Sequence, residues 1–309
     1  MESDRPLRLG TRGSPLALAQ AREIAARFAA AHPALAAVET VVISTSGDAI
    51  LDRTLADVGG KGLFTKEIDE ALLDGRIDLA VHSSKDLPTA LPEGIVVAAV
   101  PERADPRDAF ISLKAARLRD LPAGALVGTA SLRRAAQVLG RRPDIKVTPL
   151  RGNVQTRLRR LEEGVVDATL LGAAGLVRLG LLARATALLE PDEMLPAVGQ
   201  GAIAVACRAN DGPMRERLAA IDHVPSHLAL RAERAYLAVL DGSCRTPIAG
   251  FAVLRDADFD MRGLVASPDG ARVAAAGASG PSGDPEGLGR SLAHELRERS
   301  ALWRGRDGL

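Results

Sequence analysis

Aromatic residues are scarce in this chain of 309 residues: they make up only 2% of it, although 47% of the residues are hydrophobic. The core must therefore be built from Ala, Leu, Val and Ile, and the few aromatic side chains are poor guides to a functional site. No stretch approaches the roughly 18 uncharged apolar residues that a membrane-spanning helix needs. The first residues, through Ser14, contain no apolar run of the kind that directs export. We therefore expect a cytoplasmic protein with no membrane partner.

Cysteine is also rare, and neither sign of charge is in excess. Cys207 and Cys244 are the two cysteines, which is too few for a disulfide framework or a zinc site, so we expect reduced thiols and no metal. The 40 basic and 39 acidic residues leave a net charge of +1. A protein that coats nucleic acid is strongly basic, so we expect no nucleic-acid partner. Any anion site must arise from local clustering of Arg and Lys.

Short β-type runs alternate with helical patterns through roughly the first two hundred residues, which is typical of an α/β sheet protein. Helix starts are marked by the N-cap residues Ser14, Thr65, Ser131 and Asn153. The expected strands are Leu7–Thr11, Val38–Ser44, Ile77–His82, Ile95–Val100, Ala125–Thr129, Ile145–Thr148, Val166–Leu171 and Ala202–Cys207.

An approximate internal repeat divides this region in two. Gly10–Ser14 ends one strand and opens a helix, and Gly128–Ser131 does the same; Asp74–Asp78 and Glu163–Asp167 each lead into a strand. Chance similarity between ordinary turns is one explanation. The interpretation that we favour is two similar α/β lobes, hinged as in periplasmic binding proteins. Ligands of such sheets lie at the carboxyl ends of strands, against helix N-termini.

The pattern changes near Ile221, where a small α+β domain is expected to begin. Its expected elements are a helix over Ser226–Leu240, strands over Ile248–Leu254 and Phe259–Ala266, a Gly/Ser/Pro-rich loop and a helix from about Asp284. The short connection between the two strands favours an antiparallel hairpin. The predicted domains are a first lobe of residues 1–101 with 199–219, a second lobe of 102–198 and a C-terminal domain of 222–309.

A cation and a carboxylate directly follow the apolar strand that ends near Val81. The segment reads His82-Ser83-Ser84-Lys85-Asp86. A weakly stabilising surface ion pair is the ordinary explanation for Lys85 and Asp86. Their position at a strand's carboxyl end favours a functional one. A carboxylate there can stabilise a developing cation or exchange a proton.

The glycine-rich run Gly59–Glu67 stands just before a helix. It is either a flexible surface loop or a mobile lid whose Lys61 reaches an anion, and composition favours neither.

Arginines recur on or after strands and near helix starts. Arg8, Arg12 and Arg178 belong to this set, as do Arg133 and Arg134 after Ser131, and Arg151 and Arg157 around Asn153. Helix dipoles disfavour cations at N-termini by a few tenths of a kcal/mol. A solvated face explains any one of these arginines but explains the set poorly. Because a guanidinium group can donate two parallel hydrogen bonds to one carboxylate, this set of arginines predicts an anionic ligand.

The two cysteines have different surroundings in the sequence. Cys207 lies within an apolar strand and is expected to be buried packing. Cys244 stands in a turn rich in Gly, Ser and Pro, beside Arg245, whose charge favours the thiolate. We interpret Cys244 as a nucleophile or covalent attachment point.

Five blocks of this sequence resemble those of porphobilinogen deaminases, and they occur in the family's order. They are Leu9–Ala17, Val81–Thr89, Gly128–Arg134, Leu150–Val154 and Gly242–Cys244. The resemblance implies three domains and a reaction in which four porphobilinogen molecules are deaminated and joined head to tail into hydroxymethylbilane, with release of ammonia. It also implies a monomer that passes its product to uroporphyrinogen-III synthase.

The resemblance further implies a dipyrromethane cofactor, held by Cys244 through a thioether, as the primer of the growing chain. Asp86 is implied as the catalytic residue. Cofactor binding is implied for Ser83, Lys85, Ser131, Arg133 and Arg134, and substrate binding for Arg12, Ser14, Lys61, Phe64, Arg151, Arg157, Arg178 and Gln200.

One position departs from the family: Asp57 stands where members often carry a lysine, which puts a cationic role there in doubt. The competing class of protein is a hinged two-lobe protein that captures a polyanion without chemistry. Release of ammonia from porphobilinogen distinguishes the two.

Overall fold

The computed structural model describes residues 5–35, 37–49, 62–240 and 246–304. They form two compact units. The first unit contains the described residues up to 49, residues 62–104 and residues 202–227; the second contains residues 105–201 and the described residues from 228 on. Within these ranges no helix is both long and apolar enough to cross a membrane.

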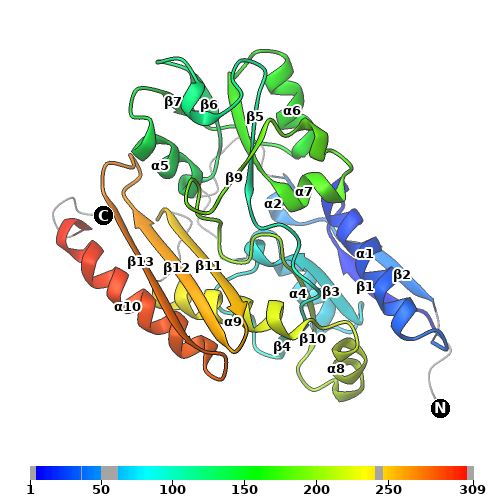
Figure 1. Ribbon diagram of the computed structural model, residues 1–309. Coiled ribbons are helices and arrows are strands. Elements are labelled where there is room, and N and C mark those ends of the chain that lie inside the picture. The colour runs from blue at the N-terminus through cyan, green and yellow to red at the C-terminus, as the bar shows by residue number, and fades with distance from the viewer. Residues whose placement is uncertain (1–4, 36, 50–61, 241–245, 305–309) are drawn as a thin grey trace. The chain divides into compact units, whose positions relative to one another are not determined.

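The first unit is an α/β lobe whose central sheet has helices on both faces (Figure 1). Its strands lie in the order β2-β1-β3-β10-β4, with β1 parallel to β2 and β3, and β10 antiparallel to both its neighbours. Residues of α1 and α8 share an apolar cluster on one face, and α4 packs on the other. The elements are β1 (Leu7–Thr11), α1 (Pro15–Ala31), β2 (Val38–Val42), α2 (Ser46–Ala49), α4 (Lys66–Leu73), β3 (Leu79–Ser83), η1 (Ser84–Asp86), β4 (Ile95–Ala99), β10 (Ile203–Arg208) and α8 (Gly212–Ala219).

The second lobe repeats this design. Its strand order, β7-β6-β8-β5-β9, matches that of the first lobe, again with one antiparallel strand beside the third parallel one. α5 packs on one face of the sheet, and α6 and α7 pack on the other. The elements are β5 (Asp108–Ser112), η2 (Leu118–Asp120), β6 (Leu126–Gly128), α5 (Leu132–Arg141), β7 (Lys146–Thr148), α6 (Val154–Glu162), β8 (Ala168–Gly172), α7 (Ala173–Arg178), η3 (Leu182–Arg184) and β9 (Ala187–Leu189).

The approximate internal repeat of the sequence corresponds to two equivalent turns, one in each lobe. The Asp78 carboxylate accepts a hydrogen bond from the backbone N–H of Arg8 at 2.9 Å, and Asp167 accepts one from that of Leu126 at 2.7 Å. Each bond ties the approach to one parallel strand to the start of its neighbour. The glycine three residues before each aspartate has a positive φ, 70° and 73°, which side chains rarely adopt. The prediction of two similar lobes is therefore confirmed.

The C-terminal domain is a three-stranded antiparallel sheet with helices packed against it. Its elements are α9 (Val224–Val239), β11 (Ile248–Arg255), β12 (Asp258–Ala266), β13 (Val273–Pro281) and α10 (Pro285–Arg304), which lies along β13 in Figure 1. Gly250 and Gly263 face each other across the ladder, and a Cβ on either would come within about 3 Å of the buried Tyr236 ring. The two glycines therefore make room for the only tyrosine of the chain.

The fold is the predicted α/β class, two lobes and a small α+β domain, and the predicted β11–β12 hairpin is confirmed. One local prediction was wrong: the Gly/Ser/Pro-rich loop after Ala266 contains the strand β13. Between Val273 and Pro281 its residues are all Ala, Gly or Ser, so they give no apolar alternation, although inner and outer positions alternate in the fold. The strands β5 and β9 were not predicted.

Candidate active site

The predicted residues of the first lobe gather at one edge of its sheet. β1 and β3 are parallel neighbours, and they end at Thr11 and Ser83. Arg12 and Ser14 follow the first strand, and Lys85 and Asp86 follow the second. Because the carboxyl ends of parallel strands share an edge, these residues lie at the same edge of the sheet, which is where ligands of such sheets bind.

Two contacts organise the β1 side of this edge. The Ser14 hydroxyl caps α1 by accepting a hydrogen bond from the backbone N–H of Ala17 at 3.2 Å. The guanidinium carbon of Arg12 lies 4.2 Å from the centroid of the Phe64 ring, within the range of a cation–π interaction. The structure therefore brings together two predicted substrate-binding side chains whose positions in the sequence are far apart.

The β3 side carries the half-buried Ser83, the buried Ser84 and two exposed charged residues. The Ser83 hydroxyl is hydrogen-bonded to the side-chain amide of Gln20 on α1, with Nε2 at 2.9 Å. The Ser84 hydroxyl is buried and has no hydrogen-bond partner. Lys85 and Asp86 are both exposed in η1, the short helix that follows the strand. An unpartnered hydroxyl beside an exposed carboxylate fits a place where a polar ligand supplies the missing hydrogen bond.

His82, the residue before this segment's serines, is a buried and neutral imidazole. Burial, together with a smaller contribution from the positive charge of Arg12, lowers its pKa from 6.5 to about 4. Its Nε2 atom is buried without a hydrogen-bond partner. The folded protein therefore excludes a proton from His82 in a pH range where the unfolded chain binds one.

We expect the stability of the wild type relative to His82→Gln to be greatest above pH 6.5 and to fall as the pH decreases toward about 4. Between these pH values the unfolded state binds one more proton than the folded state. The resulting loss in the free energy of unfolding is at most about 3 kcal/mol. Denaturant unfolding of both proteins at several pH values measures the difference. Parallel pH profiles would contradict a neutral buried His82.

The second lobe presents its predicted residues at the equivalent edge, after β6, β7 and β8. Ser131 caps α5 and accepts a hydrogen bond from the backbone N–H of Arg134 at 3.4 Å. Arg133 and Arg134 lie in the first turn of α5, as expected, but both are buried, with 6% and 5% of their surfaces exposed. Both guanidinium groups bind Asp108, at 2.7 and 2.6 Å. A buried carboxylate is costly without its partners, so these arginines also support the lobe's stability.

The other second-lobe residues are half-buried or buried, and three of them contact the backbone. Arg157 Nε donates to the carbonyl of Gly152 at 2.8 Å, and Arg178 donates to that of Gly201 at 3.3 Å. Gln200 is buried and donates to the carbonyl of Pro106 at 2.6 Å. Arg151 is half-buried in the turn between β7 and α6. Lys61, Asp57 and Cys244 lie outside the residues that the structure describes.

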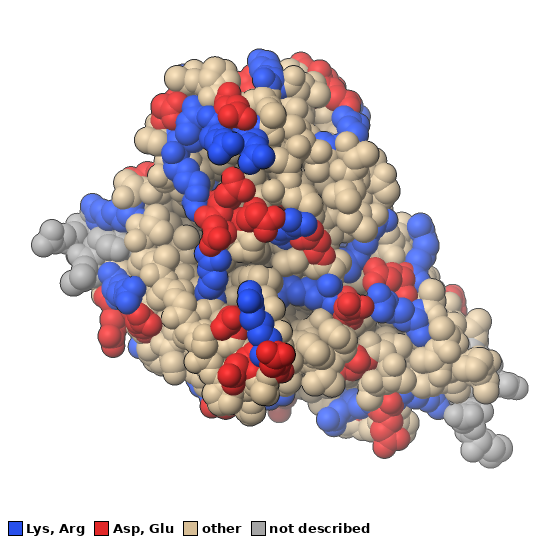
Figure 2. Space-filling view, in the orientation of Figure 1, with Lys and Arg blue, Asp and Glu red and all other residues tan. Residues whose placement is uncertain are grey.

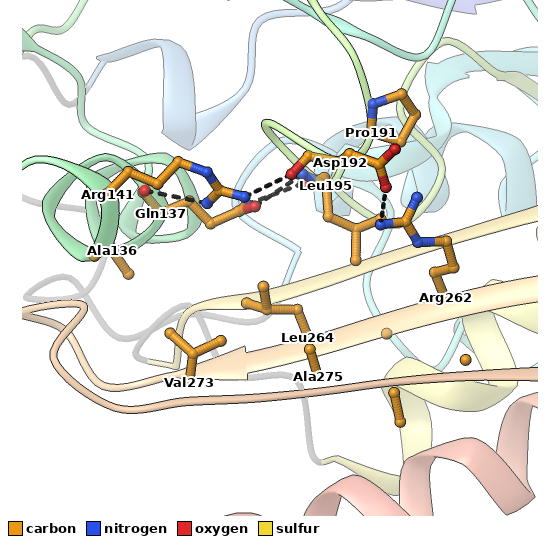
Figure 3. Close-up of a pocket in the computed structure, with 14 residues that line it drawn as sticks. Ala136, Gln137, Arg141, Pro191, Asp192, Leu195, Arg262, Leu264, Val273 and Ala275 are labelled. Atoms are coloured by element: carbon orange, nitrogen blue, oxygen red, sulfur yellow. Dashed lines mark hydrogen bonds and ion pairs between the residues drawn. The ribbon is translucent and has the colours of Figure 1, made fainter. Parts of the chain in front are cut away.

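A cavity of about 590 Å³ lies between α5 and the sheet of the C-terminal domain (Figure 3). None of the predicted site residues that the structure describes lines it. Its two arginines are already bound: Arg141 donates to the backbone carbonyl of Asp192 at 2.7 Å, and Arg262 contacts the Asp192 carboxylate at 2.7 Å. The cavity is therefore distinct from the predicted site.

Sequence reasoning missed two side chains that hold predicted site residues, Gln20 and Asp108. Neither belongs to a motif: Gln20 lies within a helical pattern, and Asp108 is one of several charged residues before a short apolar run. Each is recognisable only from its partner in the fold, 63 residues away for Gln20 and 25 or 26 for Asp108.

The chemistry of both edges is that of anion binding. Capped helix N-termini and guanidinium groups stand together after parallel strands. On the face that Figure 2 draws, basic and acidic side chains are both present, in groups of each sign. Arg133 Nε is a buried donor with no hydrogen-bond partner. The class of protein that these features favour is a two-lobed α/β protein in which each lobe offers a basic edge suited to carboxylate groups.

Comparison with known proteins identifies the family. The model described as "Porphobilinogen deaminase, dipyromethane cofactor binding domain" matches residues 7–216, and the one described as "Porphobilinogen deaminase, C-terminal domain" matches residues 227–298. The chain belongs to the porphobilinogen deaminase family. It is therefore an enzyme, a hydroxymethylbilane synthase by family, with dipyrromethane as its cofactor.

Curated relatives agree over nearly the whole chain. The porphobilinogen deaminase of Nitrobacter winogradskyi is 57% identical over 97% of this chain and 95% of that protein. The chloroplastic enzyme of Oryza sativa is 55% identical over 95% of this chain and 84% of that protein. Among solved structures, a periplasmic substrate-binding protein from Coxiella burnetii matches 74% of this chain and 96% of that chain at 20% identity and a TM-score of 0.45. That likeness is too weak to indicate function.

Proposed function

We propose that the protein deaminates four porphobilinogen molecules and joins them head to tail on a dipyrromethane primer, releasing hydroxymethylbilane and ammonia. Family matches that together span residues 7–216 and 227–298 carry this proposal. The carboxylate-binding edges of the two lobes support it. Each pyrrole of the substrate carries an acetate and a propionate, so a growing chain presents many carboxylates to guanidinium groups.

The proposed roles follow the two edges. Ser83, Lys85, Ser131, Arg133 and Arg134 hold the cofactor, whose terminal pyrrole supplies the carbon to which the first substrate is joined. The proposed substrate-binding group is Arg12, Ser14, Lys61, Phe64, Arg151, Arg157, Arg178 and Gln200. Phe64 acts through Arg12, because its ring lies against that guanidinium and fixes its orientation.

Asp86 is the proposed catalytic residue. Loss of ammonia from porphobilinogen leaves a cationic azafulvene. A carboxylate at the end of β3 stabilises that cation and accepts a hydrogen bond from the pyrrole N–H. Exposed Lys85 beside Asp86 holds a carboxylate of the cofactor near the reacting carbon. The neutral His82 behind them adds no positive charge that would oppose the cation.

We further propose that Cys244 attaches the primer through a thioether, that the protein acts as a monomer in the cytoplasm, and that uroporphyrinogen-III synthase receives the product. Arg245 beside Cys244 in the sequence favours the thiolate that such a bond needs. The chloroplastic relative from rice shows that the family is not confined to one compartment.

Incubation of the purified protein with porphobilinogen tests the proposed function. We expect one ammonia per porphobilinogen consumed, and hydroxymethylbilane as the product that cyclises or is taken up by uroporphyrinogen-III synthase. Binding of porphobilinogen without ammonia release would indicate the polyanion-binding alternative and contradict the proposal.

A further inference from the structure

Asp108, the first residue of β5, holds three of the proposed ligand-binding side chains at once. Its Oδ2 accepts from Arg133 Nη1 at 2.7 Å, and its Oδ1 accepts from Arg134 Nη2 at 2.6 Å and from Arg134 Nε at 2.9 Å. The same Oδ1 accepts from Gln200 Nε2 at 3.1 Å. No part of the Asp108 side chain is exposed, so these contacts fix the directions of all three partners.

The cluster is unbalanced in charge and in hydrogen bonds. One carboxylate and two guanidinium groups leave a net positive charge in a buried place. All three nitrogens of the Arg134 guanidinium have partners, the third bond going to the carbonyl of Leu170 at 2.9 Å. Arg133 Nε has none, although it is buried. Both imbalances are corrected by a single anionic group that accepts from Arg133.

The cluster also lies at the ligand edge of its sheet. Asp108 pairs with Gly172, the last residue of β8, so it stands at the carboxyl end of the parallel strands. In the first lobe the equivalent position, opposite the last residue of β3, is occupied by Ile203. The carboxylate is therefore not required by the fold that the two lobes share.

We propose that Asp108 is a positioning residue of the active site: it aims Arg133, Arg134 and Gln200 so that one guanidinium N–H remains available for a carboxylate of the primer or substrate. This inference rests on the proposed function. Burial alone would raise the pKa of Asp108, but the two guanidinium groups hold it below its ordinary value, so the carboxylate stays charged.

The experiment compares Asp108→Asn with Asp78→Asn as a matched control. Asp78 is a buried carboxylate that also accepts from two arginines, Arg5 and Arg8, but it lies at the opposite end of β3 from the proposed site. Both variants are expected to lose thermal stability. Only Asp108→Asn should also lose primer, measured as the fraction of protein with the adduct mass, and show a KM for porphobilinogen raised about tenfold, the equivalent of one charged hydrogen bond.

Asp108→Glu keeps the proposal testable if Asp108→Asn does not fold, because it retains the charge and moves the carboxylate by one methylene group. Raised KM or reduced primer occupancy in folded Asp108→Glu supports positioning. The positioning role would be overturned if an Asp108 variant that folds has the primer occupancy of Asp78→Asn and a KM within twofold of wild type. Wild-type protein that carries no primer and releases no ammonia would instead contradict the proposed function.

Discussion

Replacing Asp86 by Asn is expected to lower kcat by about 10²-fold or more, because the carboxylate that stabilises the substrate cation is lost. The side chain is exposed in η1, so the variant should fold normally and keep its covalent primer. Steady-state ammonia release gives kcat, and the mass of the intact protein gives primer occupancy.

Asp120 offers a matched control for this change. It is also an exposed aspartate that ends a short 3₁₀ helix directly after a basic residue, but η2 precedes β6 and does not follow a parallel strand. Asp120→Asn is expected to keep wild-type kcat. If Asp86→Asn retains more than a tenth of wild-type activity with full primer occupancy, Asp86 is not the catalytic carboxylate.

Replacing Cys244 by Ser is expected to remove most or all of the covalent primer and, with it, activity. A serine hydroxyl is hardly ionised at neutral pH, whereas a thiolate favoured by Arg245 can attack an electrophilic carbon and hold the product as a thioether. The adduct mass of the purified variant measures the loss.

Cys207→Ser is the control, because Cys207 is a free thiol inside the first lobe with none of its surface exposed. Burial raises its pKa to about 11, so little thiolate is present at neutral pH. This variant should keep the primer. An adduct that survives in Cys244→Ser and disappears in Cys207→Ser would place the attachment at Cys207 and contradict the proposal.

Much of the fold follows from local patterns. β1 has the bounds that its alternating residues predict, and the caps Ser14, Ser131 and Asn153 make the hydrogen bonds expected of them. Thr65 stands at the start of α4 but makes no side-chain capping bond. The strand β5 was missed because its first residue is the charged Asp108, and charges are uncommon within strands buried on both faces.

The site was predicted as a set of residues but not as a set of contacts. The order of strands in the sheet explains why Arg12, Lys85 and Asp86 share an edge, and strand ends are readable from the sequence. The burial of Arg133 and Arg134 was not readable, because a pair of arginines at a helix start has the same spacing whether it faces solvent or a buried carboxylate. Only the fold brings Asp108 to them.

The central claim, an enzyme that builds a tetrapyrrole on its own covalent primer, is tested most directly by the intact mass of the wild-type protein. We predict a mass above that of the sequence by one dipyrromethane. Limiting porphobilinogen should then add further steps, each equal to one deaminated pyrrole unit. Fully active protein at its bare sequence mass would contradict the account.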